Sequence, residues 1–157
     1  MAERLGRAFV ADALGDEASQ VEIASAGTHA VVGSGMHPDS ALALRGYGAE
    51  AGDFRARQLV DGMADSADLT LTLTRAHRDQ VLRGSPRAMA RTFTLREAAD
   101  LVQRFGDAEF DGELLPDRAR NLVRAMADAR SQRHVGARTT SATPSASRSR
   151  CTTRLPS

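Results

Sequence analysis

The sequence predicts an α/β protein whose parallel sheet carries helices on both faces. Short β-forming segments alternate with amphipathic helical segments along most of the chain, and this alternation is typical of parallel sheets. Apolar residues make up 41% of the 157 residues and aromatic residues only 4%, so the core must be aliphatic. A chain of this length forms one domain with a real core, not two.

The first two predicted elements are a helix over residues 1–14 and a strand over residues 21–24. The helical segment consists of good helix formers, and Leu5 and Phe9 stand four residues apart, which predicts one buried face. Gly15 ends the helix. The β-branched segment that follows is short enough to be a strand.

Residues 21–38 organise the rest of the prediction, because the strand runs directly into a glycine-rich loop. In parallel sheets, ligands bind at the carboxyl ends of the strands, where such loops lie. Pro38 then begins a second helix, which Gly46 and Gly48 end. The loop is therefore the first candidate for a ligand-binding edge.

The middle of the chain predicts a short helix over residues 60–65 and a buried strand over residues 69–73, where Leu and Thr alternate. Thr74 is placed to cap the helix that follows it, and Gly84 closes that helix.

A third strand is predicted over residues 89–94, followed by a helix over residues 95–105. Thr94 and Glu97 have the spacing of a capping box at the start of this helix. An acidic loop then leads to the last predicted helix, residues 117–134, whose inward-facing residues are Leu122, Val123 and Met126.

The charge balance excludes a general affinity for polyanions. Twenty-one basic residues, all of them arginine, face 20 acidic ones, which leaves a net charge of +1. We therefore expect no nucleic-acid partner and no membrane partner. No apolar run approaches the ~20 residues that span a bilayer, and no leader is recognisable, so the expected location is the cytoplasm. The single cysteine, Cys151, cannot form an internal disulfide.

Several side chains attract attention without forming a recognisable site. No partner stands at metal-ligand spacing from His77, so a helix-surface or capping role is favoured. His29 and His37 flank the glycine-rich loop, where simple loop polarity is favoured over a ligand cleft. The same ordinary interpretation applies to the remaining candidates, which lack dinucleotide, acidic-partner or calcium-loop patterns: Gly33-Ser34-Gly35, Arg55 and Arg57, and Asp107, Asp111 and Glu113.

The composition changes after Gly136. Residues 137–157 are rich in Ser, Thr, Arg and Pro without apolar periodicity, which predicts a disordered tail. GC-rich codons for this segment can encode an Asp-Pro pair in another reading frame. We interpret the tail as frameshifted, and the domain as residues 1–136.

An ordered series of segments resembles the bacterial low-molecular-weight protein tyrosine phosphatases over residues 1–136. The segments are Met1-Ala2-Glu3 with its helix, Ser25-Ala26-Gly27-Thr28, Arg55-Ala56-Arg57-Gln58-Leu59, residues 68–78 (DLTLTLTRAHR) and Phe93-Thr94-Leu95-Arg96-Glu97.

The resemblance implies a flavodoxin-like sheet and phosphotyrosine hydrolysis through a cysteinyl-phosphate. In the family, a thiolate in a Cys-x5-Arg loop attacks the phosphate, and an Asp-Pro aspartate protonates the leaving phenol. A loop of amides at a helix N-terminus lowers the thiol pKa and binds the dianion. The implied substrates are a phosphotyrosine protein or a small aryl phosphate, and no cofactor or metal is implied.

This chain departs from the family pattern at the catalytic loop. Its first helix resembles the one that follows the loop, so we expect the loop and the first, central strand to be missing. The residue six positions after Cys151 is Ser157, not Arg. We therefore expect no catalytic, cofactor-binding or metal-ligating residue in this sequence, and no activity of the chain as written.

Two other interpretations stay open at this point. The chain could be a non-catalytic interaction module, or a pseudogene remnant, on the same fold. A third interpretation is the related arsenate reductase chemistry, which uses additional cysteines. Only Cys151 is present, which counts against it.

Overall fold

The computed structural model describes residues 1–106 and 108–139. In chain order the elements are α1 (Ala2–Leu14), η1 (Gly15–Gln20), α2 (Pro38–Gly46), η2 (Met63–Asp65), β1 (Thr70–Thr72), α3 (Arg75–Gly84), η3 (Pro86–Arg91), β2 (Thr92–Thr94), α4 (Leu95–Val102) and α5 (Leu115–Thr139), where η denotes a 3-10 helix. No helix among the described residues is both long and apolar enough to cross a membrane.

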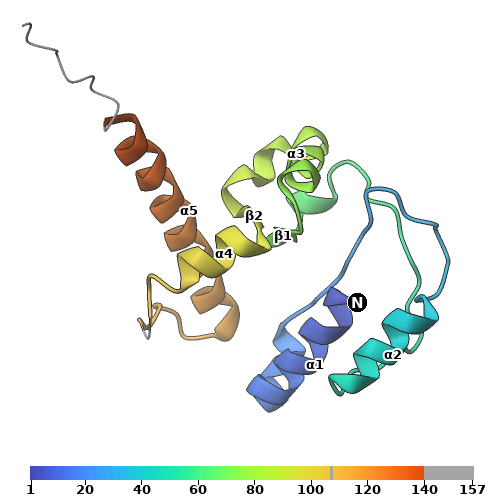
Figure 1. The fold of residues 1–157 in the computed structure, drawn as a ribbon. Coiled ribbons are helices and arrows are strands. Elements are labelled where there is room, and N and C mark those ends of the chain that lie inside the picture. The colour runs from blue at the N-terminus through green and yellow to red at the C-terminus, as the bar shows by residue number, and fades with distance from the viewer. Residues whose placement is uncertain (107, 140–157) are drawn as a thin grey trace, which may run out of the picture.

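The fold is α/β with a parallel sheet, as the sequence predicts. Strands β1 and β2 pair in parallel, with Leu71 opposite Phe93 in the register. Figure 1 shows α3 on one side of these strands and α4 and α5 on the other. Helices α1 and α2 form a separate group, joined to the strands by extended segments.

The main core lies where α4 and α5 meet β2. Its members are apolar side chains that are almost completely buried: Phe93, Ala98, Leu101, Val123 and Met126. The predicted inward face of the last helix is confirmed, because Val123 and Met126 are in this core and Leu122 packs against it. A smaller cluster of Ala64, Val81 and Ala88 joins α3 to η2 and η3.

The Arg130 side chain links α5 to the sheet. Its guanidinium carbon lies 4.4 Å from the centre of the Phe93 ring. The same group donates hydrogen bonds to the carbonyl oxygens of Thr92 (2.9 Å) and Met89 (2.7 Å). Charge-assisted bonds to backbone oxygens and a cation over an aromatic face are each favourable when partly shielded from water. One side chain therefore couples the last helix to β2.

The capping signals predicted from sequence are confirmed. The Thr74 hydroxyl accepts a hydrogen bond from the His77 amide at 3.2 Å. Thr94 and Glu97 form the full capping box, with the Glu97 amide donating to the Thr94 hydroxyl and the Thr94 amide donating to the Glu97 carboxylate. These bonds satisfy amide groups that the first turn of a helix leaves free.

The predicted strand over residues 21–24 is not formed as a strand. Only an isolated parallel bridge between Gly27 and Gln58 follows this segment. A strand needs a ladder partner, and within the described residues no strand lies beside residues 21–24. The carbonyl of Ile23 instead accepts two hydrogen bonds from the Arg7 side chain.

Two predicted buried faces are exposed. On α1, Phe9 is 73% exposed, because the helix packs mainly on η1 and residues 21–25. In and beside β1, Leu71 and Leu73 are 45% and 70% exposed, whereas Thr72 is buried. Alternate side chains point to opposite faces of a sheet, and within the described part of the chain the face that carries these leucines is left uncovered.

Element boundaries differ from the prediction where local turns intervene. Gly62 has a left-handed backbone conformation, and the predicted 60–65 helix is shortened to η2 after it. The 3-10 helix η3 begins at Pro86 and takes up the first half of the predicted 89–94 strand, so only Thr92–Thr94 form β2. Helix α4 ends at Val102 because its last turns tighten toward left-handed Gly106. Helix α5 exceeds the predicted 117–134 at both ends. The predicted disordered tail begins at residue 137, but residues 137–139 are the last residues of α5. Residues 140–157 of that tail lie outside the described residues.

Removal of the Arg130 side chain should loosen β2 and α5 together. In Arg130→Ala the carbonyl bonds and the ring contact are lost, which costs about 2 kcal/mol or more. We expect the amides of Thr92–Thr94 to exchange with deuterium about 30-fold faster. Arg104→Ala, an exposed position on the chain segment after α4, is the matched control. Equal exchange in the two variants would contradict this role of Arg130.

Candidate functional site

The loop that follows residues 21–26 is held against residues 55–59 by a set of backbone hydrogen bonds. The Gly27 amide donates to the Arg57 carbonyl (2.9 Å), and the Leu59 amide donates to the Gly27 carbonyl (2.8 Å). Further along, the Gly33 amide donates to the Ala56 carbonyl at 2.8 Å. We call residues 27–34 with residues 55–59 the loop wall. It stands where the extended segment ends, which is the carboxyl edge predicted to carry ligands.

Gln58 closes the loop wall with its side chain. Its amide oxygen accepts from the Ala30 amide (2.9 Å), and its amide nitrogen donates to the Thr28 carbonyl (2.8 Å). A side-chain amide can bridge two backbone groups in this way because it carries both a donor and an acceptor. Gln58 belongs to the segment Arg55-Ala56-Arg57-Gln58-Leu59, which carries part of the family resemblance, but no local pattern predicts this bridging role.

A chain of polar contacts joins the loop wall to α1. The Ser25 hydroxyl donates to Glu3 (2.6 Å), and Arg57 donates to the Ser25 carbonyl (2.6 Å). Arg7 pairs with Glu3 at 2.9 Å and also donates to the Ile23 carbonyl. These contacts fix the extended segment between α1 and the loop wall.

A second link runs from α1 to residues 52–54. The Arg4 guanidinium donates to the Asp53 carboxylate at 2.9 Å. This hydrogen bond lowers the pKa of Asp53. The ion pair is therefore present at pH values above the usual carboxyl pKa. It is lost as the pH falls through the lowered pKa of Asp53. Asp53 is exposed, so the contact positions the loop more than it stabilises the fold.

The N-terminus of α1 points its first amides toward solvent without a side-chain cap. Met1 occupies the cap position, and no side chain accepts a hydrogen bond from the first turn. Free amides and the helix dipole make such an end favourable for anions. The first turn of α1 is therefore a place where an anion would be favourable.

The three histidines whose side chains the structure describes do not gather into one site. His37 accepts from the Asp39 amide at 3.3 Å and caps α2. His29 is exposed, with its ring 3.3 Å from the Thr28 hydroxyl. His77 lies in the first turn of α3, where its backbone amide is capped by Thr74.

The other residues considered as site candidates from the sequence either make contacts within the fold or have no contact in the described part of the chain. Arg57 is used within the loop wall, and Arg55 donates to the adjacent Phe54 carbonyl. The Asp111 carbonyl accepts from Asn121. Among the described residues, no three His, Cys, Asp or Glu side chains come together as a metal site. Asp107 and Cys151 lie outside the described residues.

The fold and this edge define the class of flavodoxin-like α/β proteins, in which a loop and a helix N-terminus meet at the carboxyl side of a parallel sheet. The family model for low molecular weight phosphotyrosine protein phosphatases matches residues 1–110. The chain belongs to this family.

Solved structures of similar fold support that assignment. The tyrosine phosphatase AmsI of Erwinia amylovora is 25% identical, with a TM-score of 0.50, and the match covers 86% of this chain and 81% of that one. YfkJ from Bacillus subtilis is 15% identical with a TM-score of 0.56, over 89% of this chain and 86% of that one. The tyrosine phosphatase Wzb from Escherichia coli K30, in complex with sulphate, is 16% identical with a TM-score of 0.50, over 84% and 89% of the two chains.

The last two similarities concern the fold alone, because their sequence identities are low. No curated protein is significantly similar in sequence.

Loss of the Gln58 side chain should open the loop wall. In Gln58→Ala the Ala30 amide loses its acceptor, so we expect that amide to exchange about tenfold faster. Gln103→Ala, an exposed position after α4, serves as the control. If Ala30 exchanges at the same rate in both variants, the Gln58 bridge does not hold the loop.

Proposed function

We propose that residues 1–136 are the part of a low-molecular-weight tyrosine phosphatase domain that follows the phosphate-binding loop, and that the chain as written does not hydrolyse phosphotyrosine. The observation that carries this proposal is the absence of a Cys-x5-Arg pattern anywhere in the 157 residues, whose one cysteine is Cys151. Without the thiolate no cysteinyl-phosphate can form, and without the loop arginine the transferring phosphoryl group has no bidentate partner.

The exposed leucine face of β1 supports the proposal. Leu69, Leu71 and Leu73 are all at least 40% exposed, although leucines that alternate along a strand normally cover a core. Residues 21–26 also lack a strand partner among the described residues. A further strand beside β1 would pair with its open edge and widen the sheet, on which a helix could then cover the leucines.

The free end of α1 supports the same arrangement. A strand in that position would lead, through a loop, to Met1 and the uncapped first turn of α1. The loop amides and the helix end would then surround one anion, which is how this family's chemistry binds a phosphate dianion. Glu3, Arg7 and Ser25 would hold that helix in place through the contacts described above.

With such a loop, the substrates would be a phosphotyrosine protein or a small aryl phosphate, and the reaction needs no metal ion. The extended protein would act in the cytoplasm. Arsenate reductase chemistry is disfavoured, because it requires further cysteines that these 157 residues lack.

An interaction module is the second candidate function, and the exposed apolar side chains favour it. Phe9, Tyr47 and Leu73 are each at least 70% exposed. Such side chains are suited to contact another protein surface. A catalytic assay separates the two functions.

The chain as written should give no turnover of p-nitrophenyl phosphate above the buffer rate. The genomic DNA before the Met1 codon is the decisive companion measurement. We expect an in-frame Cys, five residues, Arg and Ser or Thr, and the extended protein should hydrolyse the substrate. Its Cys→Ser variant is the matched control and should be inactive. Turnover by the 157-residue chain itself would refute the proposal.

We also propose that the domain ends at residue 136 and that residues 137–157 arise from a frameshift. The codons for residues 138–157 test this proposal directly. We expect another frame to encode the Asp-Pro pair that supplies the family's general acid. If neither alternative frame contains Asp-Pro, the frameshift hypothesis fails, while the assay above still tests the missing nucleophile.

A further inference from the structure

The edge of β1 that faces away from β2 is open. Within the described residues, the backbone of residues 69–73 makes no hydrogen bond outside the parallel ladder with β2. A strand carries backbone donors and acceptors along both of its edges, and these groups are costly to leave without a partner. An open edge of this kind pairs readily with another strand.

The segment lacks the features that usually protect an edge strand. Residues 69–74 have the sequence Leu-Thr-Leu-Thr-Leu-Thr, without a charged residue, a proline or a glycine. Their three leucines, Leu69, Leu71 and Leu73, are exposed. Charges, proline or a bulge protect most natural edge strands from pairing with other chains. An uncharged segment of high β-propensity is instead suited to pair with a further strand.

The sequence of this edge is self-complementary when two copies of the chain run antiparallel. A two-fold axis perpendicular to the sheet at Leu71 places this residue beside Leu71 of the second copy. The same register brings Leu69 to Leu73 and Thr70 to Thr72 of that copy, because leucine and threonine alternate symmetrically about position 71. Directly opposite residues of antiparallel strands point to the same face. The exposed leucines of both copies would therefore lie side by side.

The charges at the two ends of the segment favour the antiparallel orientation. Asp68 precedes the segment, and Arg75 follows it. Antiparallel copies bring the Asp68 end of each strand to the Arg75 end of the other, whereas parallel copies bring like charges together. In the described part of the chain, Arg75 has no carboxylate within ion-pair distance. The end charges therefore match a second copy of this chain.

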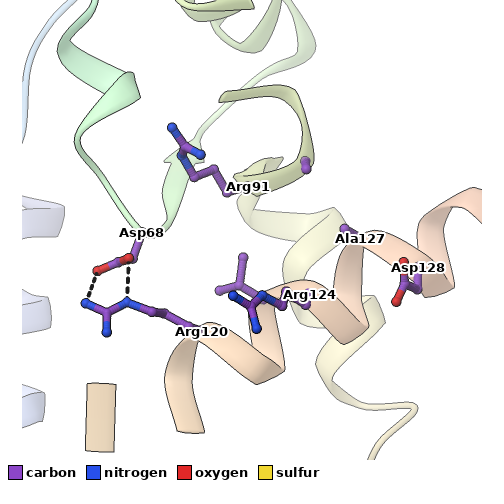
Figure 2. Close-up of a pocket in the computed structure, with 8 residues that line it drawn as sticks. Asp68, Arg91, Arg120, Arg124, Ala127 and Asp128 are labelled. Atoms are coloured by element: carbon purple, nitrogen blue, oxygen red, sulfur yellow. Dashed lines mark hydrogen bonds and ion pairs between the residues drawn. The ribbon is translucent and has the colours of Figure 1, made fainter. Parts of the chain in front are cut away.

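The Asp68 end of the segment is already held in place by α5. Arg120 donates from Nε and Nη2 to the two carboxylate oxygens of Asp68 at 2.9 and 3.4 Å, as the dashed lines in Figure 2 show. The Asp68 side chain remains 61% exposed, and a carboxylate can accept more than two hydrogen bonds. Asp68 can therefore face a second cation, and the edge needs little reordering before it pairs.

We propose that the 157-residue chain forms a weak two-fold dimer in which residues 69–73 of two copies pair antiparallel about Leu71. Each copy uses its own β1 edge, so the assembly closes at two copies. The contact is short, which indicates the affinity of a small, transient interface. The dimer does not rest on the proposed phosphatase function. A further strand beside β1 in an extended protein would occupy the same edge and prevent the dimer.

Sedimentation equilibrium of the full chain tests the dimer. We expect the average mass to rise with concentration from that of the monomer towards twice that value, with a Kd on the order of 100 µM. Leu71→Lys places two cations opposite each other and should weaken association at least about tenfold. Leu71→Glu should have the same effect through two carboxylates. A purely monomeric unmodified chain at ~1 mM would overturn the proposal.

An equal mixture of the Leu71→Lys and Leu71→Glu variants tests the register. In the proposed register, the introduced lysine of one chain lies opposite the introduced glutamate of the other, and opposite charges across a strand pair are favourable. We therefore expect the mixture to form dimers that neither variant forms alone. A mixture that associates no more than the separate variants would show that Leu71 does not meet itself, and the proposal would fail.

Leu42→Lys is the matched control, because Leu42 is an exposed leucine on α2 and the substitution changes the net charge equally. It should leave the Kd unchanged. Unchanged amide signals of residues 93–101 show that Leu71→Lys retains the core. Equal weakening in the Leu42→Lys and Leu71→Lys variants, or assembly beyond two copies, would contradict a closed dimer through β1.

Hydrogen exchange of the unmodified chain gives a test that needs no substitution. We expect amides within residues 69–73 to exchange more slowly at high protein concentration than at low concentration, because the dimer supplies acceptors along the open edge. Amides of α1 should exchange at the same rate at both concentrations. If the mass rises while exchange in residues 69–73 does not change, the contact lies elsewhere and the proposal is wrong.

Discussion

The contact of Arg130 with Phe93 is the interaction on which the ordered part of this sheet depends. The sheet has only two short strands among the described residues, which is too little for a ladder to be stable by itself. Arg130 adds hydrogen bonds from α5 to the backbone of η3 at Met89 and of β2 at Thr92, and it covers the buried aromatic ring. Burial lowers the pKa of Arg130, with Glu97 4.0 Å away acting in the opposite direction. An arginine stays charged under these conditions, so the contact persists at ordinary pH.

The sheet has a buried part and an open part. Strand β2 contributes Phe93 to a core with Leu101 and Met126, whereas Leu71 of β1 and the flanking Leu69 and Leu73 face solvent. Burying a leucine stabilises a protein by ~1.5–3 kcal/mol relative to exposing it. The exposed leucines thus represent stabilisation that this chain does not obtain from its own described residues.

Much of the local structure could be predicted from the sequence, because local signals act over three or four residues. Thr74 and the Thr94–Glu97 pair cap helices in the structure as their spacing predicts. The strand predicted over residues 21–24 and the buried face predicted around Phe9 failed for a shared reason. Both predictions require a packing partner from a remote part of the chain. A β-branched or amphipathic pattern indicates only that such a partner would be favourable, not that one is present.

The same distinction between local and remote interactions applies to the candidate site. The family was recognisable from segments such as Ser25-Ala26-Gly27-Thr28, and the family model confirms it. The bridging role of Gln58 could not be predicted, because its contacts join residues 28 and 30 positions apart. The sequence by itself determined the α/β class, the helix starts and the family. Only the tertiary structure decided which faces are covered and which arginines pair with a carboxylate, because burial and ion pairing depend on distances between segments that are remote along the chain.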